Sequence, residues 1–132
     1  MNSDDGAPSL VPRSVDTVLL NMSTSASKFI FEMLPPWQEI TERGAETVAD
    51  LKRELRRDHV LYGVQAEAWA RRIDCNDVLF RIFGRNEQFA VVHLTPSGER
   101  DPNKAWPSTF LFFDAEAWRI DRMVPDHQDY TG

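Results

Sequence analysis

His93 is the residue whose type and position point most directly to chemistry. It ends an expected strand, two residues before Thr95 and ahead of a polar loop that contains Trp106. An imidazole at a strand end that faces a loop can act as a general base. The alternative is a ring that packs among apolar neighbours and hydrogen-bonds a backbone group or Thr95. No nucleophile and acid stand at a catalytic spacing, so His93 and Thr95 are the only candidate catalytic residues.

Cys75 lies in a turn-rich run together with Asp74, Asn76 and Asp77. Nearby carboxylates raise the pKa of a thiol, which is the wrong direction for a nucleophile. The run also lacks the spacing and the distal Glu of a calcium-binding loop. Because Asp and Asn are common turn formers, we expect a turn here and a structural Cys75.

No metal site and no cofactor are expected. A single Cys can form neither an internal disulfide nor a zinc cluster. Phosphate-binding glycine motifs and the GxSxG motif are absent from the sequence. Outside the acidic tail around His127, the histidines (His59, His93 and His127) are not paired at helical spacing with another His or an acid.

A basic cluster closes the first expected helix. Glu54 and Asp58 interrupt it, which favours a solvated helix end that complements the helix dipole. A nucleic-acid role would need this cluster and Arg71 and Arg72 to form one patch. The net charge of −6, from 15 basic and 21 acidic residues, argues against that role. The cluster consists of Lys52, Arg53, Arg56 and Arg57.

Trp106 and Trp118 are the candidate binding residues. Both lie outside the expected sheet in a chain with four Trp. Tryptophan is common at the centres of protein interfaces. The alternative interpretation is that both rings cap the open side of a small sheet.

The apolar spacing predicts a long helix over residues 37–57, opened by Pro35 and Pro36. Steps of three and four separate Trp37, Ile40, Gly44, Val48, Leu51 and Leu55. A short final helix is expected from residue 115 to about 124, capped by Asp114 and stopped by Pro125.

Four strands are expected between these helices. Residues 69–73, 78–83 and 88–94 predict an antiparallel meander, and residues 109–113 a largely buried fourth strand. An even loop would set Ile82 opposite Phe89, Phe80 opposite Val91 and Val78 opposite His93. The preceding turn would pair Ile73 with Val78 and Trp69 with Ile82. One face would then collect Trp69, Ile73, Val78, Phe80, Ile82, Phe89 and Val91, covered by the long helix.

The predicted fold class is therefore α+β: a long N-terminal helix packed on a four-stranded, mainly antiparallel sheet, with a short C-terminal helix. Residues 33–132 are expected to form a single domain. Residues 1–32 form a disordered or weakly tethered leader, with disorder expected to about Ala26 and with Phe29 and Phe31 as tethers.

Several segments resemble a family of small uncharacterised bacterial proteins with the pattern ARRxDxxDVLF … AVVHLT … WPxT. Pro96 stands where that family has a Trp. The resemblance covers about residues 33–130 and implies a fold and a bacterial origin. It carries over no catalytic residue, because the family has no assigned activity. The matching segments are residues 51–55, 70–80, 90–95 and 106–109, with Trp118 and Met123.

These features predict a cytoplasmic protein without a nucleic-acid or membrane partner. No window reaches 18 consecutive apolar residues. The first hypothesis is a non-enzymatic protein-binding module, an immunity-like or accessory protein, whose partner is another protein or a second copy. The alternative is a small hydrolase or transferase that uses His93.

Overall fold

The computed structural model describes residues 27–95 and 107–132. The chain divides into two units, Met1–Ile30 and Phe31–Gly132, and every helix and strand described lies in the second. The predicted disordered leader to residue 26 and Trp106 lie outside the described residues. The predicted domain boundary therefore stays a prediction.

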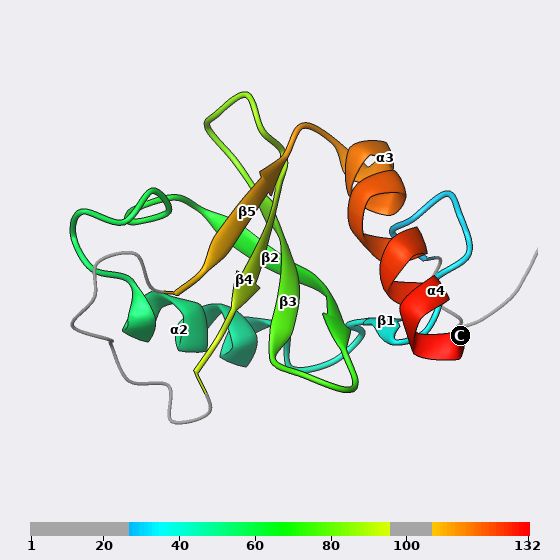
Figure 1. Cartoon of the computed structure of the whole chain (residues 1–132). Coiled ribbons are helices and arrows are strands. Elements are labelled where there is room, and N and C mark those ends of the chain that lie inside the picture. Colours follow the sequence, from blue (N-terminus) through cyan, green and yellow to red (C-terminus); the bar gives the residue numbers. More distant parts are fainter. Residues whose placement is uncertain (1–26, 96–106) are drawn as a thin grey trace, which may run out of the picture. The chain divides into compact units, whose positions relative to one another are not determined.

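Five antiparallel strands form one sheet, in the order β1-β2-β3-β4-β5 (Figure 1). The sheet and its helices make the fold α+β, as predicted. The sequence predicts only four strands, because the apolar spacing of residues 37–57 favours a helix where the first strand lies. The strands are β1 (Trp37–Glu39), β2 (Ala66–Arg72), β3 (Asp77–Ile82), β4 (Phe89–His93) and β5 (Thr109–Phe112).

The prediction of a long N-terminal helix over residues 37–57 is wrong, because a strand and a shorter helix lie there. The helix, α2, spans Gly44–Glu54. The backbone N–H of Ile40 donates to the carbonyl of Trp69 at 2.9 Å, so this segment bonds to β2 instead of to its own preceding turn. Arg43 then adopts a left-handed conformation with φ 63°, which separates the strand from the helix. The spacing of Trp37 and Ile40 fits this arrangement as well as it fits a helix.

One face of the sheet packs against α2, as the apolar spacing predicts. Leu51 and Leu55 are only 2% and 4% exposed. The predicted core positions Val78, Phe80 and Ile82 are confirmed on this face. The whole core cluster consists of Ile40, Leu51, Leu55, Leu61, Ala68, Val78, Phe80, Ile82, Ala90, Val92 and Leu94.

The predicted register of β3 against β4 is wrong by one residue. Phe80 lies opposite Ala90 instead of Val91, and Val78 lies opposite Val92 instead of His93. A slip of one residue moves side chains to the other face, so Phe89 and Val91 leave the α2 side. The loop between the strands has an odd number of residues, whereas the prediction assumed an even number. It contains Gly84 with φ +88°, a conformation that glycine tolerates best.

The register of β2 against β3 also differs from the prediction. Ala66 lies opposite Ile82, and Arg71 opposite Val78. A bulge between Ala68 and Ala70 inserts an extra residue into β2, and such a bulge redirects side chains. As a result the Trp69 ring contacts the Phe89 ring on the face opposite α2, with the centroids 5.1 Å apart. Ile73, expected in the core, is 58% exposed.

The face opposite α2 is apolar as well, and the C-terminal helical segment (residues 115–131) packs on it. Leu79, Val91 and Phe89 are at most 2% exposed. The rings of Trp37 on β1 and Trp118 on the helical segment meet edge to face at 5.1 Å. The sheet is therefore covered by helix on both faces, where the sequence predicted one covered face.

The C-terminal helical segment continues through Pro125, which was expected to stop it. It consists of α3 (Ala115–Trp118), the π-helical turn η2 (Arg119–Met123) and α4 (Val124–Thr131). Pro125 lies in the first turn of α4, just after the wider π turn, where its missing N–H is tolerated. The predicted cap is confirmed: the Asp114 carboxylate accepts from Ala117 N at 2.8 Å.

Within the described part of the chain, the helices are too short or too polar to cross a membrane.

Candidate functional site

His93 lies at the end of β4, directly opposite Asp77 at the start of β3. Its Nδ1 lies 2.6 Å from Asp77 Oδ1. Because an ionised carboxylate only accepts, Nδ1–H donates and fixes the tautomer. The His93 side chain is 44% exposed and that of Asp77 15% exposed. The structure thus supplies the acid partner that the sequence analysis did not find, and the signal for it was the cross-strand pair.

Asp77 also ties this pair to the C-terminal helical segment. Its second oxygen accepts from Arg122 at 3.0 Å, and Arg122 Nε donates to Asp126 at 3.3 Å. Asp126 in turn accepts from the Trp37 indole N–H at 2.9 Å. We call His93, Asp77, Arg122, Asp126 and Trp37 the His93 network. It links β1, β3, β4 and the C-terminal helical segment in one chain of polar contacts.

Arg72 extends this network toward the turn after β2. It lies 3.3 Å from Asp126 and donates twice to Asp74, at 2.8 Å. The hydrogen bonds from Arg72 lower the pKa of Asp74. Asp74 thus does more than form a turn, since it holds a guanidinium beside the network.

Thr95 contacts α2 through a buried carboxylate. Its backbone N–H lies 3.0 Å from both oxygens of Glu54, which is only 1% exposed. Burial raises the pKa of Glu54, while the hydrogen bonds from Thr95 oppose the rise. Sequence reasoning missed Glu54, although its spacing of three from Leu51 places it on the apolar side of the helix. Thr95 therefore anchors the end of α2 to the end of β4.

The candidate binding residue Trp118 is 0% exposed. Its ring lies between Trp37 and Phe31, the latter at 6.2 Å between centroids. This placement corresponds to the alternative interpretation, in which the ring covers the sheet.

The three histidines each hydrogen-bond a different segment. His59 accepts from Leu61 N at its Nδ1, so its Nε2 carries the proton toward the Pro107 carbonyl at 3.0 Å. His127 Nδ1 lies 2.6 Å from the Pro35 carbonyl. Among the described residues no group of three or more His, Cys, Asp and Glu is placed to hold a metal ion.

Cys75 is half-buried, and its thiol pKa is raised. Burial is the main cause, and the charges of Asp77 and Asp74 add to it. The direction predicted from the sequence is confirmed. A thiol with a raised pKa is a poor nucleophile at neutral pH.

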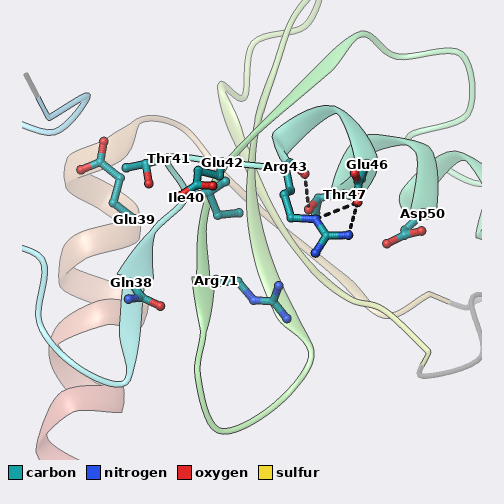
Figure 2. Close-up of a pocket in the computed structure, with 10 residues that line it drawn as sticks. All are labelled: Gln38, Glu39, Ile40, Thr41, Glu42, Arg43, Glu46, Thr47, Asp50 and Arg71. Atoms are coloured by element: carbon teal, nitrogen blue, oxygen red, sulfur yellow. Dashed lines mark hydrogen bonds and ion pairs between the residues drawn. The ribbon is translucent and has the colours of Figure 1, made fainter. Parts of the chain in front are cut away.

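A polar cavity of about 400 Å³ lies between β1 and the start of α2 (Figure 2). Figure 2 shows Glu42, Arg43 and Glu46 on the helix side and Gln38 and Arg71 on the strands. Arg43 pairs with Glu46 at 2.7 Å, and this contact raises the pKa of Arg43. The cavity is therefore lined by polar groups that solvate one another. The lining residues are Gln38, Glu39, Ile40, Thr41, Glu42, Arg43, Glu46, Thr47, Asp50 and Arg71.

The most unusual surface lies along β5. Phe110 is 57% and Phe113 65% exposed, although the sequence predicted a largely buried strand. No charged residue occurs in Thr109–Phe113, which we call the β5 edge. Phe110 is bounded on one side by Arg122, whose guanidinium carbon lies 5.9 Å from the ring centroid.

In comparisons with known proteins, the chain matches no family model, no curated protein and no solved structure. The resemblance drawn from the sequence therefore stays a prediction.

Proposed function

We propose that this chain is a non-enzymatic protein-binding module, an immunity-like or accessory protein, and that it binds through the β5 edge. The observation that carries the proposal is the exposure of Phe110 and Phe113, each more than half accessible. Phenylalanine is one of the residues most often buried, and exposed aromatic side chains mark interaction sites.

The position of these rings strengthens the proposal. β5 is the last strand of the sheet and pairs with β4 on one side only among the described residues. Natural edge strands are usually protected by charges, by proline or by a covering loop. The β5 edge has no charge over Thr109–Phe113, which favours an edge that is covered by a partner.

The test compares three forms of the full chain: wild type, the Phe110→Ser/Phe113→Ser double variant, and Ile73→Ser. Ile73 is 58% exposed and lies just after β2, so its variant is a matched control for lost apolar surface. Each form is immobilised, and bound bacterial proteins are quantified by mass spectrometry. Self-association is followed by sedimentation velocity.

Wild type and Ile73→Ser are expected to bind the same protein, or to self-associate equally. The double variant should lose at least about tenfold of that binding, which corresponds to ~1.4 kcal/mol. Identical capture by all three forms, together with a monomer at every concentration, would contradict the proposal.

A second candidate function rests on the pair of His93 and Asp77. A half-exposed imidazole oriented by a carboxylate at 2.6 Å is the arrangement of a general base and its orienting acid. It supports the hydrolase or transferase alternative. His93→Gln should then abolish any hydrolysis of ester or phosphoester substrates by the purified chain, and activity that survives the substitution rules His93 out.

A further inference from the structure

The outer side of β5 offers the groups that a further strand would bind. Among the residues that the structure describes, β5 is the terminal strand of an entirely antiparallel meander (Figure 1). A terminal strand presents a row of backbone N–H and C=O groups to one side. Addition of a strand there would continue the existing sheet and would need no rearrangement of the fold.

The charge of the chain limits where two copies can meet. The net charge is −6, so two copies repel each other unless they meet on a neutral surface. Thr109–Phe113 is such a surface, because it contains no ionisable side chain. Pairing of one edge with the same edge of a second copy forms a closed, two-fold interface in which each contact occurs twice.

The geometry of antiparallel pairing then fixes the register. Residues directly opposite each other place their side chains on the same face of the sheet. Side chains alternate between the two faces along a strand, so within Thr109–Phe113 only Phe110 and Phe112 share a face with Phe110. In a two-fold pair, Phe110 therefore lies opposite Phe110 or Phe112 of the other copy. The register centred on Leu111 pairs the whole edge with itself, with Phe110 opposite Phe112 and Thr109 opposite Phe113.

This register also avoids repulsion at the ends of the paired segment. The next pair along places Asp114 opposite Ser108 of the other copy, so no carboxylate faces a carboxylate. Asp114 keeps its role as the cap of α3, because its Oδ1 already accepts from Ala117 N at 2.8 Å.

We propose that this chain forms a two-fold dimer by antiparallel pairing of β5 with β5 of a second copy, centred on Leu111, which makes one continuous ten-stranded sheet. This inference rests on the proposed function and names the partner of the same edge.

The exposed area predicts a weak association. A phenylalanine side chain buries about 150–250 Å² when fully covered, so the exposed parts of Phe110 and Phe113 contribute roughly 100–150 Å² each. The four rings of two copies then bury roughly 400–600 Å², which is below the area of about 1,200 Å² at which stable interfaces begin. We expect a dissociation constant on the order of micromolar or weaker, and therefore a concentration-dependent dimer.

The first experiment measures the dimer by sedimentation equilibrium of the full chain. Phe110→Lys places two like charges beside the two-fold axis and should weaken association at least tenfold. Ile73→Lys adds the same charge at an exposed position away from β5 and should leave association unchanged. Both substitutions are at exposed positions, so circular dichroism should show a folded chain in each case.

The second experiment tests the register by a disulfide. In a Cys75→Ser background, Leu111→Cys places two thiols opposite each other at the axis. Directly opposite Cα atoms lie about 4.5–5.5 Å apart, which is within the range of a disulfide. Mild oxidation should give a covalent dimer, whereas Ile73→Cys in the same background should give no covalent dimer.

The outcomes separate this inference from the proposed function. A wild-type chain that is monomeric at the highest concentration, or a dimer that survives Phe110→Lys and does not cross-link at Leu111→Cys, overturns the inference. If that monomer still captures another protein through Phe110 and Phe113, the proposed function stands. If both the dimer and the capture are absent, both proposals fail.

Discussion

Glu54 is the residue whose ionisation should affect stability most clearly. Burial raises its pKa, so the folded state favours the protonated carboxyl. The stabilisation is complete below the ordinary value of 4.5 and is lost as the pH rises through the raised, folded-state pKa. Glu54→Gln cannot ionise. Its free energy of unfolding, measured relative to wild type by urea denaturation, should therefore increase as the pH is raised above 4.5.

A hydrophobic substitution distinguishes the contribution of the Glu54 charge to stability from the contribution of its hydrogen bonds with Thr95. Glu54→Leu leaves the half-buried N–H of Thr95 without its carboxylate acceptor, which should cost about 1–3 kcal/mol at neutral pH. Glu54→Gln keeps one acceptor oxygen and should cost less. Equal losses for the two variants would show that the hydrogen bond contributes nothing.

Asp77 joins the two parts of the His93 network, since it accepts hydrogen bonds from both His93 and Arg122. Asp77→Asn removes the charge that both donors share and should lower the free energy of unfolding by about 1.5–3 kcal/mol. His93→Gln should cost less than about 1 kcal/mol, because the His93 side chain is 44% exposed. Urea denaturation of both variants checks the order, and a larger loss for His93→Gln contradicts it.

At the scale of elements, the cap of the C-terminal helical segment gives a direct test. Asp114→Ala removes the acceptor for Ala117 N and should cost about 0.5–2 kcal/mol. Asp114→Asn keeps a capping oxygen and is the matched control, with little expected change. Thermal denaturation of both variants measures the effect. If Asp114→Asn is as destabilised as Asp114→Ala, the carboxylate charge matters more than the cap.

The elements that depend on local interactions were the predictable ones. The later turns of α2, the three central strands and the Asp114 cap follow from spacing and from capping preference. β1 was not predictable, because the N–H of Ile40 bonds to the distant carbonyl of Trp69. The passage of the last helix through Pro125 depends on a π turn that has no sequence signal here.

The candidate site was predictable to the same extent. His93 was found by its type and its place at a strand end, but its partner Asp77 depends on the register of β3 against β4, which an odd loop shifted by one residue. The apolar run from Phe110 to Phe113 is typical of a strand that is buried on both faces in the interior of a sheet. Phe110 and Phe113 are exposed because β5 is the last strand of the described sheet. The sequence alone does not give the order of the strands, so this exposure could not be predicted.

For the molecule as a whole, the distribution of charge predicts how self-association depends on salt. Each copy carries a net charge of −6, while the segment proposed to pair, Thr109–Phe113, contains no ionisable side chain. The long-range force between copies is then repulsive, and the short-range force is apolar. Raising the salt from about 0.01 M to about 0.15 M shortens the Debye length from ~30 Å to ~8 Å and screens the repulsion.

The β5-paired dimer should therefore become tighter as salt is added, with a dissociation constant that falls across this range in sedimentation equilibrium. Phe110→Lys lowers the net negative charge by one unit, yet it should still weaken the dimer, because its two added charges lie on one face of the sheet, diagonally across the axis and about 7–8 Å apart. An interface built from ion pairs would show the opposite trend and weaken with salt. The sign of the salt dependence thus decides whether copies meet through the neutral edge of the sheet or through their charged surfaces.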